Sequence, residues 1–368
     1  MSFFTFNSEP HRRFVLWLLA LVVLPVAVLF VIGIYLQPLY GDLTRIGFYS
    51  EREFGWSGTQ IIFPNTKLEF NALPNNNSQL YKILVLGDSF SRVHPELQWQ
   101  NYLKEIPHES IGTMDINKIR LRQILASQGF RDNPPKVLIM ESVERELPHY
   151  LKENMSTCQI TPSDTRKIDS SPDITPIIDW NWESHIADIT QHKSREINPS
   201  EINPSYVLKF LWNNIPGDLI HPNVYRIDIT RPALFSSRDQ SAFLVYQDDV
   251  NKIKLWRNMG LPEMSCRIEE IRRQVEANGY TRFILMVPPD KLTAYSDYLS
   301  DLKFQHTSLL TALSELRPKV MPRIDKALIT AIHAGEQDVY FPDDTHWASN
   351  GQRIAADTLI SFLKNQNH

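Results

Sequence analysis

Two short motifs near opposite ends of the chain carry the residue types of an acyl-transfer triad. One reads GDSF and contains Ser89, and the other reads DDTHW and contains His346 after two acids, Asp343 and Asp344. A serine hydroxyl is a poor nucleophile at neutral pH unless a nearby base removes its proton. The base in turn needs a carboxylate that fixes its tautomer. The motifs therefore predict that Ser89 attacks an ester carbonyl with His346 as the base, and sequence spacing alone favours neither acid.

The residues before Ser89 place this side chain at the edge of a sheet. Residues 81–86 read YKILVL, an apolar run of strand length. Ligands of α/β proteins bind outside the carboxyl ends of the strands. Each motif alone has a simpler explanation, because GDS can be a strand-to-helix turn with a serine cap and a lone Asp-x-His can be a surface loop. The two motifs together favour an active site.

The order of the two motifs resembles that of the SGNH/GDSL hydrolases. Three further strings narrow the resemblance to the alginate O-acetyltransferase AlgX/AlgJ-like group: ESVEREL at 141–147, VPPDK at 287–291 and DTHW at 344–347. The resemblance covers residues 81–150 and 262–365. It implies an SGNH-type α/β fold and transfer of acetyl groups to sugar hydroxyls through an acetyl-serine.

The resemblance bears on the choice of the acid, and the chain departs from it in one respect. In the alginate proteins Asp-x-His-Trp precedes the serine motif, whereas here the serine comes first, as in ordinary SGNH enzymes. Triads are defined by geometry and not by chain order, so the chemistry is unaffected. The different order means, however, that the polysaccharide substrate need not be alginate. The wider SGNH pattern, Asp-x-x-His, selects Asp343. The narrower motif, completed by Trp347, selects Asp344, which we favour.

Other residues of these motifs are candidates for supporting roles. The Ser89 amide is expected in the oxyanion hole, because charge on the tetrahedral intermediate needs preorganised donors. Arg145 follows a strand and either aims donors at an oxyanion or acceptor or forms a salt bridge to Glu141 or Glu144. Lys291 either contacts substrate or is a solvated helix start. The remaining candidates are Asp88 for catalysis or the oxyanion, and Trp347 and Trp56 for substrate binding.

An apolar segment near the N-terminus predicts a membrane anchor. Residues 14–36 contain no charge, and about 20 apolar residues suffice to cross a bilayer. A signal peptide has a shorter apolar region and a small-residue cleavage site, which we do not find after Leu36. The HRR at 11–13 precedes the segment and Asp42 is the first charge after it. The positive-inside rule therefore predicts a cytoplasmic N-terminus and a large domain on the outer side. Together with the resemblance, this implies a single-pass protein of the bacterial inner membrane with its catalytic domain in the periplasm.

Composition excludes several classes of function. The 368 residues include 38 basic and 42 acidic residues, for a formal net charge of −4, so there is no basic footprint for nucleic acid. The chain has no CxxC or His-rich cluster, and we expect no metal or cofactor. Cys158 and Cys266 both lie in the exported part, where a disulfide or two buried thiols are equally compatible with the sequence.

Alternating strand and helix patterns predict an α/β sandwich with a mainly parallel sheet. Strands are expected at 81–86, 136–140 and 282–287, helical patterns up to about 128, and helices at 262–278 and 349–363. The expected division is a cytoplasmic N-terminus (1–13), the transmembrane anchor (14–36), a lead-in (37–80), a first core part (81–150), an insertion or cap (151–261) and a second core part (262–368). The insertion contains tryptophans that either stack on sugars or serve as buried anchors: Trp180, Trp182, Trp212 and Trp256.

These observations predict a membrane-anchored extracytoplasmic O-acetyltransferase that acts on a bacterial exopolysaccharide. The resemblance implies that a polytopic membrane-bound O-acyltransferase supplies the acetyl groups. One alternative is an SGNH esterase that removes acyl groups with the same triad, because the two reactions differ only in whether water or a sugar hydroxyl attacks. Another is a non-catalytic polysaccharide-binding assembly subunit.

Overall fold

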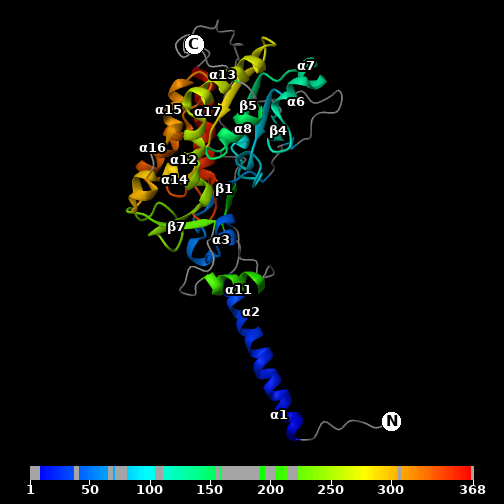
Figure 1. Ribbon diagram of the computed structural model, residues 1–368, viewed down its shortest axis with the longest axis vertical. Helices are drawn as coiled ribbons and strands as arrows, with labels where there is room; N and C mark the ends of the chain where they lie inside the picture. The colour runs from blue at the N-terminus through cyan, green and yellow to red at the C-terminus, as the bar shows by residue number, and fades with distance from the viewer. Residues whose placement is uncertain are drawn as a thin grey trace, which may run out of the picture.

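The protein consists of an α/β domain carried on a helical stem (Figure 1). The computed structural model describes residues 9–36, 41–64, 69–70, 81–103, 111–154, 158, 191–194, 204–213, 223–305 and 308–365. The stem contains α1 (Glu9–Leu18) and α2 (Leu24–Leu36), joined by a π-helical turn at Leu19–Val23. The chain ends at the far side of the domain from the stem.

The centre of the domain is a five-stranded sheet in the order β2-β4-β3-β5-β9, in which every neighbouring pair is parallel. The strands are β2 (Glu69–Phe70), β3 (Ile83–Gly87), β4 (Ile111–Asp115), β5 (Val137–Glu141) and β9 (Arg282–Met286). From β3 the chain pairs first with β4 on one side and then with β5 on the other. This reversal makes β3 and β5 the topological switch point, where α/β sheets bind their ligands.

Helices cover both faces of this sheet, because successive strand residues point to opposite faces. Val85 and Ile139 belong to one apolar cluster with α16 and α17, whereas Leu84 and Leu138 belong to a second cluster with α6, α8, α13 and α15. The helices are α6 (Leu121–Ala126), α8 (Leu147–Asn154), α13 (Leu261–Glu276), α15 (Leu309–Leu316), α16 (Ile324–Ala334) and α17 (Ser349–Asn365). The domain is thus a three-layer α/β sandwich with both sheet faces buried.

Shorter elements complete the described part of the chain. They are α3 (Asp42–Gly47), α4 (Glu51–Phe54), β1 (Gln60–Ile62), η2 (Ser89–Ser91), α5 (Gln100–Leu103), α7 (Gln128–Asp132), β6 (Gln191–Lys193), α11 (Pro204–Asn213), β7 (Val224–Asp228), β8 (Ala242–Tyr246), α12 (Gln247–Met259), α14 (Lys291–Ala294), η4 (Ser296–Tyr298) and η5 (Leu302–Phe304). The pairs β1/β6 and β7/β8 are antiparallel.

The structure confirms the predicted strands as β3, β5 and β9 and the predicted helices as α13 and α17. The prediction of only helical patterns between the serine turn and residue 128 was wrong, because the buried strand β4 lies there. Its five residues include Gly112, Thr113 and Asp115, so no continuous apolar run marks it. The environment between β2 and β3, and not the local sequence, makes this segment a strand.

Part of the expected insertion packs into the core. Ile227 and Phe243, on β7 and β8, belong to the main apolar cluster. Trp256 on α12 is buried, and its indole donates a hydrogen bond to the Glu144 carbonyl (2.9 Å), so it is a structural anchor. Trp212 is half exposed, whereas Trp180 and Trp182 lie outside the described residues. The domain boundaries at 151 and 261 stay a prediction.

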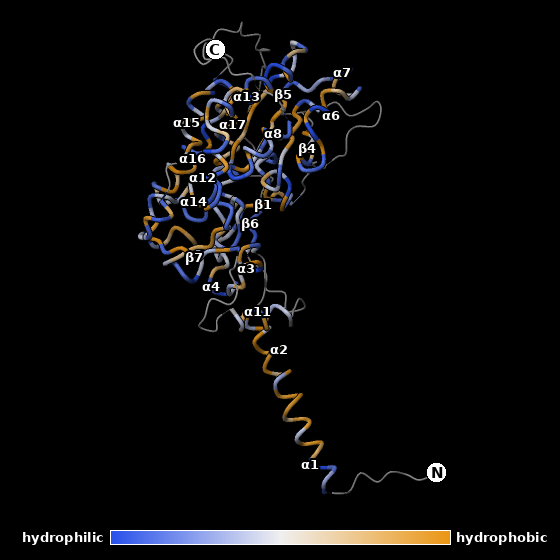
Figure 2. Tube along the Cα trace, viewed as in Figure 1, coloured by the Kyte–Doolittle hydropathy of each residue, from blue (hydrophilic) through white to orange (hydrophobic). Residues whose placement is uncertain are grey.

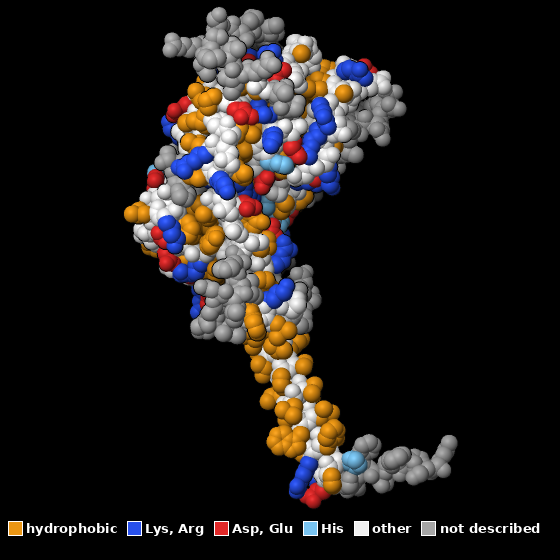
Figure 3. All heavy atoms as spheres, in the orientation of Figure 1, with side chains coloured by type: hydrophobic (Ala, Val, Ile, Leu, Met, Phe, Trp, Pro, Cys, Tyr) orange, Lys and Arg blue, Asp and Glu red, His pale blue; other side chains and the backbone are white. Residues whose placement is uncertain are grey.

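The stem is long and apolar enough to cross a bilayer. The helix from Glu9 to Leu36 is 28 residues long, which corresponds to about 42 Å. Figure 2 shows that most of the stem is hydrophobic, and Figure 3 shows apolar side chains along it and charged side chains at its N-terminal end. The π-helical turn ends two residues before Pro25, which has no backbone N–H and crowds the preceding turn.

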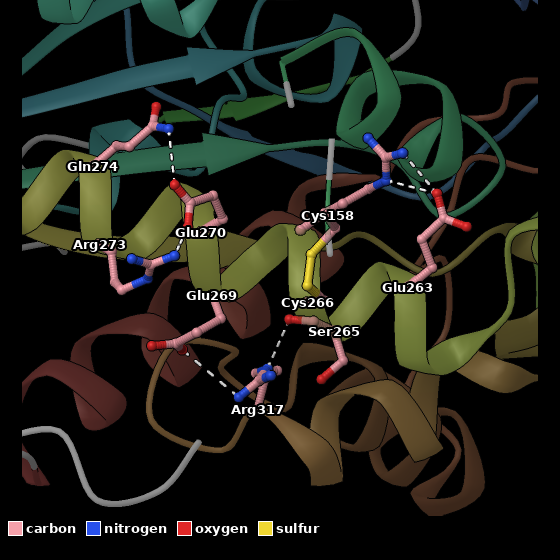
Figure 4. The surroundings of a disulfide bond; sticks show 10 residues. Cys158, Glu263, Ser265, Cys266, Glu269, Glu270, Arg273, Gln274 and Arg317 are labelled. Carbon is pink, nitrogen blue, oxygen red and sulfur yellow. Dashed lines mark hydrogen bonds and ion pairs between the residues drawn. A yellow bond between two sulfur atoms is a disulfide. The ribbon is translucent and has the colours of Figure 1, made fainter. Parts of the chain in front are cut away.

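A disulfide joins Cys158 to Cys266 on α13, which settles the alternative that the sequence left open (Figure 4). The two cysteines are 108 positions apart. Beside the bridge, Arg317 donates a hydrogen bond to the Ser265 carbonyl (3.0 Å) and faces Glu269 across 3.6 Å. The bridge therefore links the segment after α8 to a helix of the core.

We expect Cys266→Ser to lower the free energy of unfolding by about 2–5 kcal/mol, because a cross-link over a long loop restricts the unfolded chain. Urea unfolding of the full-length protein in detergent, followed by tryptophan fluorescence, measures the loss. Cys158→Ser is the matched control and should cause the same loss, with no further loss in the double variant. Equal midpoints for the oxidised and reduced wild-type protein would contradict this prediction.

Candidate active site

The serine turn lies at the carboxyl end of β3. Ser89 begins the short turn η2 and is partly exposed. Asp88 holds the turn in place, because its Oδ1 accepts a hydrogen bond from the Phe90 amide (2.9 Å) and its Oδ2 accepts one from the Val143 amide (2.8 Å). Val143 follows β5, so Asp88 ties together the two loops that diverge at the switch point. The geometry gives Asp88 a positioning role, which differs from the expected catalytic or oxyanion role.

Below the turn lies a buried carboxyl group whose role the sequence did not indicate. Glu141 Oε2 accepts hydrogen bonds from the Asp88 amide (3.1 Å) and the Ser91 hydroxyl (2.8 Å). Burial, followed by the charge of Asp88, raises the pKa of Glu141 well above its usual range. A side chain added at Gly87 would lie 2.7 Å from Ser91 and 2.8 Å from Glu141. Glycine is therefore required at position 87 for this close approach. The sequence suggested Glu141 only as a salt-bridge partner for Arg145.

The structure brings His346 and Asp344 together. His346 Nδ1 lies 2.6 Å from Asp344 Oδ1, and the same oxygen accepts a hydrogen bond from the His346 amide at 3.0 Å. Both residues are buried. The His346 ring packs against Phe90, next to Ser89, with 4.9 Å between ring centroids. The expected base and the expected nucleophile therefore belong to two segments in direct contact.

The electrostatics of the pair suit a base that stays close to a fixed carboxylate. Burial would lower the pKa of His346, but the charge and hydrogen bond of Asp344 outweigh it and raise this pKa above its usual value. Burial would likewise raise the pKa of Asp344, but His346 lowers it well below its usual range. The carboxylate is thus ionised across the neutral range and stabilises an imidazolium.

The second ring nitrogen of His346, Nε2, does not form a hydrogen bond with any described residue. This atom is buried, and the Ser89 hydroxyl is not bonded to it in this state. Catalytic hydrogen bonds are often long in unliganded enzymes and tighten when substrate binds. With Nδ1 turned to Asp344, the neutral ring presents Nε2 as a proton acceptor.

Lys291 fixes the loop that carries the histidine. Its ammonium donates to the carbonyls of Phe341 (2.7 Å), Pro342 (3.1 Å) and Asp344 (2.7 Å). Lys291 is 1% exposed, which differs from both the expected substrate contact and the solvated helix start. Burial lowers the pKa of Lys291 to about 7, although Asp343 and Asp344 act in the opposite direction.

Arg145 and Lys252 join a buried network behind the site. Arg145 pairs with Asp290 (2.6 Å) and Asp249 (3.1 Å), and Lys252 pairs with Glu144 (2.8 Å) and Asp290 (3.0 Å). The expected salt bridge from Arg145 to Glu141 or Glu144 was wrong. These contacts join α12 to the loops after β5 and β9. Burial and then the charge of Asp290 raise the pKa of Asp249 to about 7, despite the nearby cations.

The segment after the stem docks on the same loop, which sequence analysis did not predict. The Asp42 amide donates to Asp344 Oδ2 (3.3 Å), and the Leu43 amide donates to the Asp343 carbonyl (2.9 Å). A Cβ at Gly41 would lie 2.1 Å from the Asp343 carbonyl oxygen, so only glycine permits this approach. One ligand atom each of Asp42, Asp344 and His346 lies within 4.8 Å of the others. Such a set could hold a cation, and the expected absence of a metal stays a prediction.

A pocket of about 70 Å³ opens beside Asp344. It is lined by residues of the lead-in, the serine-turn loop, β6 and the histidine loop: Gly41, Trp56, Gln60, Ile62, His94, Glu96, Leu97, Lys193, Phe341, Asp343 and Asp344. The rings of Trp56 and Phe341 form a tilted pair with centroids 5.7 Å apart. Trp347 does not line the pocket, because it is buried against Phe90 with ring centroids 5.1 Å apart.

We expect Asp344→Asn to reduce acyl-enzyme formation by about 10⁴-fold, because an amide favours the wrong tautomer of the histidine. The acidic limb of the pH–rate profile should also move to lower pH. His346 is active as a base above its pKa, and removal of the Asp344 charge leaves the burial that lowers this pKa. Release of a chromogenic alcohol from a small acetyl ester measures both effects.

Asp343→Asn is the matched control for this experiment, because it makes the same change in the neighbouring acid of the same loop, whose backbone carbonyl accepts a hydrogen bond from the Leu43 amide. It should keep most of the activity and an unchanged acidic limb. A greater loss for Asp343→Asn than for Asp344→Asn would identify Asp343 as the triad acid.

Comparison with known proteins found one matching family. Residues 245–368 match the family model described as SGNH hydrolase-like domain, acetyltransferase AlgX. The match contains Lys291, Asp344 and His346 and also α12, which the sequence placed in the insertion. No curated protein and no solved structure matches the chain. Residues 245–368 are therefore similar to the SGNH hydrolase-like domain of the AlgX acetyltransferases.

Proposed function

We propose that this protein is a membrane-anchored O-acetyltransferase that places acetyl groups on hydroxyls of a bacterial exopolysaccharide in the periplasm. The observation that carries the proposal is the hydrogen bond between His346 Nδ1 and Asp344, with Nε2 open, against the GDS turn. Support also comes from the match of residues 245–368, which include Asp344 and His346, to an SGNH hydrolase-like domain whose chemistry is of the acetyltransferase or esterase type.

The reaction proceeds in two balanced steps. In the first step the Ser89 oxygen attacks the acetyl carbonyl of the donor while His346 Nε2 takes the hydroxyl proton. The tetrahedral intermediate collapses to acetyl-Ser89, and His346 gives the proton to the leaving group. In the second step a sugar hydroxyl attacks acetyl-Ser89, its proton passes to Nε2, and collapse of the intermediate returns that proton to Ser89.

The Ser89 amide is proposed as one donor to the oxyanion. It is the first amide of η2, and the first amides of a helical turn have no acceptor within that turn. Asp88 caps Phe90 and not Ser89. Oriented backbone donors of this kind stabilise charge that develops in a transition state. Arg145 acts on this site at a distance, because its charge lowers the pKa of His346.

The pocket beside Asp344 is proposed as the acceptor site. Aromatic faces suit sugars because they pack on C–H surfaces, and Trp56 and Phe341 supply such faces within the lining. The pocket also contains carboxylates and Lys193, which can bond hydroxyls. Its small volume suits part of one sugar unit, so the rest of a polymer must lie on the surface outside it.

The acetyl donor is proposed to be a polytopic membrane-bound O-acyltransferase. The support for this partner is the apolar stem together with the family match. A single-pass anchor would keep the active site at the membrane surface, where a donor protein of the inner membrane releases its acetyl groups. No nucleic acid is proposed as a partner.

We expect Ser89→Ala and His346→Ala each to reduce acetyl transfer by about 10³-fold or more with the fold intact, because triad members act as a unit. Intact-protein mass spectrometry after a short pulse of acetyl ester should detect an added acetyl group on the wild type and none on Ser89→Ala. Circular dichroism provides the control for folding. A folded Ser89→Ala protein with near-normal turnover would overturn the proposed nucleophile.

We expect Trp56→Leu to divert acetyl groups from sugar to water, because the acceptor loses its aromatic contact while acetyl-Ser89 still forms. Free acetate and acetylated oligosaccharide are measured together by mass spectrometry, with exopolysaccharide fragments several sugars long as acceptors. Trp56→Phe is the matched control and should retain most of the transfer.

The same measurement on the wild type separates the two reaction types. Acetylated fragments as a major product support a transferase. Acetate alone with every fragment, together with rapid deacetylation of an acetylated polymer, would leave an esterase.

A further inference from the structure

Helix α11 presents an apolar face to solvent that no other described part of the chain covers. Leu208, Leu211 and Trp212 are 54%, 37% and 51% exposed. Their spacing of three and four residues places them along one side of the helix. The opposite side is buried, since Tyr206 and Val207 form an apolar cluster with Leu36 at the end of α2. The exposed face is therefore the outer side of a helix that is fixed to the stem.

The position of α11 along the stem matches the edge of a bilayer. Its cluster includes Leu29, Ile32 and Leu36 of α2, a stretch of about 10 Å along the helix axis. These residues are the last turns of the apolar segment at 14–36. Interfacial helices immerse their apolar face by about 5–10 Å at the boundary between headgroups and acyl chains. Figure 1 shows α11 lying across the end of α2 and not along it.

The residue types of this region also suit an interface. Trp212 on α11 and Tyr35 on α2 are both about half exposed near the same end of the stem, and such aromatic residues concentrate at membrane surfaces. Arg52 lies over the Tyr35 ring at 4.2 Å, and Lys209 lies over the Phe48 ring at 5.5 Å. Long cationic side chains can place their charged ends among lipid headgroups while their aliphatic parts cover apolar surface.

We propose that α11 is an interfacial helix, with Leu208, Leu211 and Trp212 immersed in the outer surface of the bilayer that α2 spans. The inference rests on the proposed anchoring of the stem, and it adds a second membrane contact, contributed by a segment about 170 positions later in the chain. A single helix leaves the domain free to rotate and tilt, whereas two contacts with different directions fix its orientation.

This contact is mechanically linked to the active site. The Tyr206 hydroxyl donates to the Thr44 carbonyl (3.1 Å) and contacts the Tyr49 carbonyl. Thr44 belongs to α3, whose first amides bond Asp343 and Asp344. The lipid surface, α11, α3 and the histidine loop thus form one continuous series of contacts. Seating of α11 on the bilayer sets the height of the catalytic loop above it.

The test uses full-length protein in vesicles of phosphatidylethanolamine and phosphatidylglycerol. Single variants Leu208→Cys, Leu211→Cys and Trp212→Cys are labelled with an environment-sensitive fluorophore, while the native disulfide stays oxidised. Lipids brominated near the headgroup should quench each label several-fold more strongly than a label at Leu316→Cys. Leu316 is the matched control, because it is 52% exposed at the end of α15, away from the stem.

Each outcome decides the inference. Labels on α11 that behave like the Leu316 label would overturn it, and so would labels shielded from water but not quenched by lipid, which indicate a protein occupant. A label at Val28→Cys tests the anchor separately, since Val28 is 49% exposed in the middle of the stem. Quenching at Val28 without quenching on α11 refutes the interfacial helix alone. Absence of both refutes the anchor, and turnover of a soluble acetyl ester confirms that every variant is folded.

Discussion

The site depends on one buried ammonium group. Lys291 donates to three carbonyls of the loop that leads to His346, and no apolar side chain could satisfy these oxygens. A buried carbonyl without a partner costs about 1–3 kcal/mol, so the loop has a strong preference for the one conformation that the lysine accepts. In that conformation the Asp344 carboxylate lies against the imidazole of His346.

The other buried cations near the site, Arg145 and Lys252, lie behind the candidate triad and not within it. Arg145 and Lys252 neutralise carboxylates on three different segments, which converts loops at the sheet edge into a rigid base. Buried ion networks of this type contribute little net stability, but loss of one member leaves an uncompensated charge. Their value here is geometric, because the serine turn and the histidine loop must meet from opposite ends of the chain. Glu141 serves the same purpose beneath the serine turn, where it accepts hydrogen bonds from the Asp88 amide and the Ser91 hydroxyl.

Local sequence patterns were sufficient to predict the central strands of the sheet and the serine, histidine and carboxylate of the candidate site. The apolar runs of β3, β5 and β9 are visible because each is buried on both faces, whereas β4 contains Gly112 and Thr113 and takes its structure from its neighbours. Two adjacent acids could not be separated by spacing, since only the turn of the loop determines which carboxylate reaches Nδ1. The partners of Arg145 lie 104 and 145 positions away, and no local signal exists for such pairs. The contact of Asp42 with Asp344 and the exposed face of α11 could not be predicted for the same reason.

The contact between Asp42 and Asp344 spans 302 positions, which has a consequence for the order of events during synthesis. Chains fold progressively from the N-terminus as they are made, yet here the earliest part of the folded domain completes its contacts only with one of the latest. The entropic cost of closing a loop grows slowly with its length. Formation of this contact is therefore delayed by the time needed to synthesise the rest of the chain, and not by a large free-energy barrier. A chain that is truncated or incompletely translocated cannot assemble the surroundings of this carboxylate. The contact between Asp42 and Asp344 therefore forms only when nearly the whole polypeptide is present.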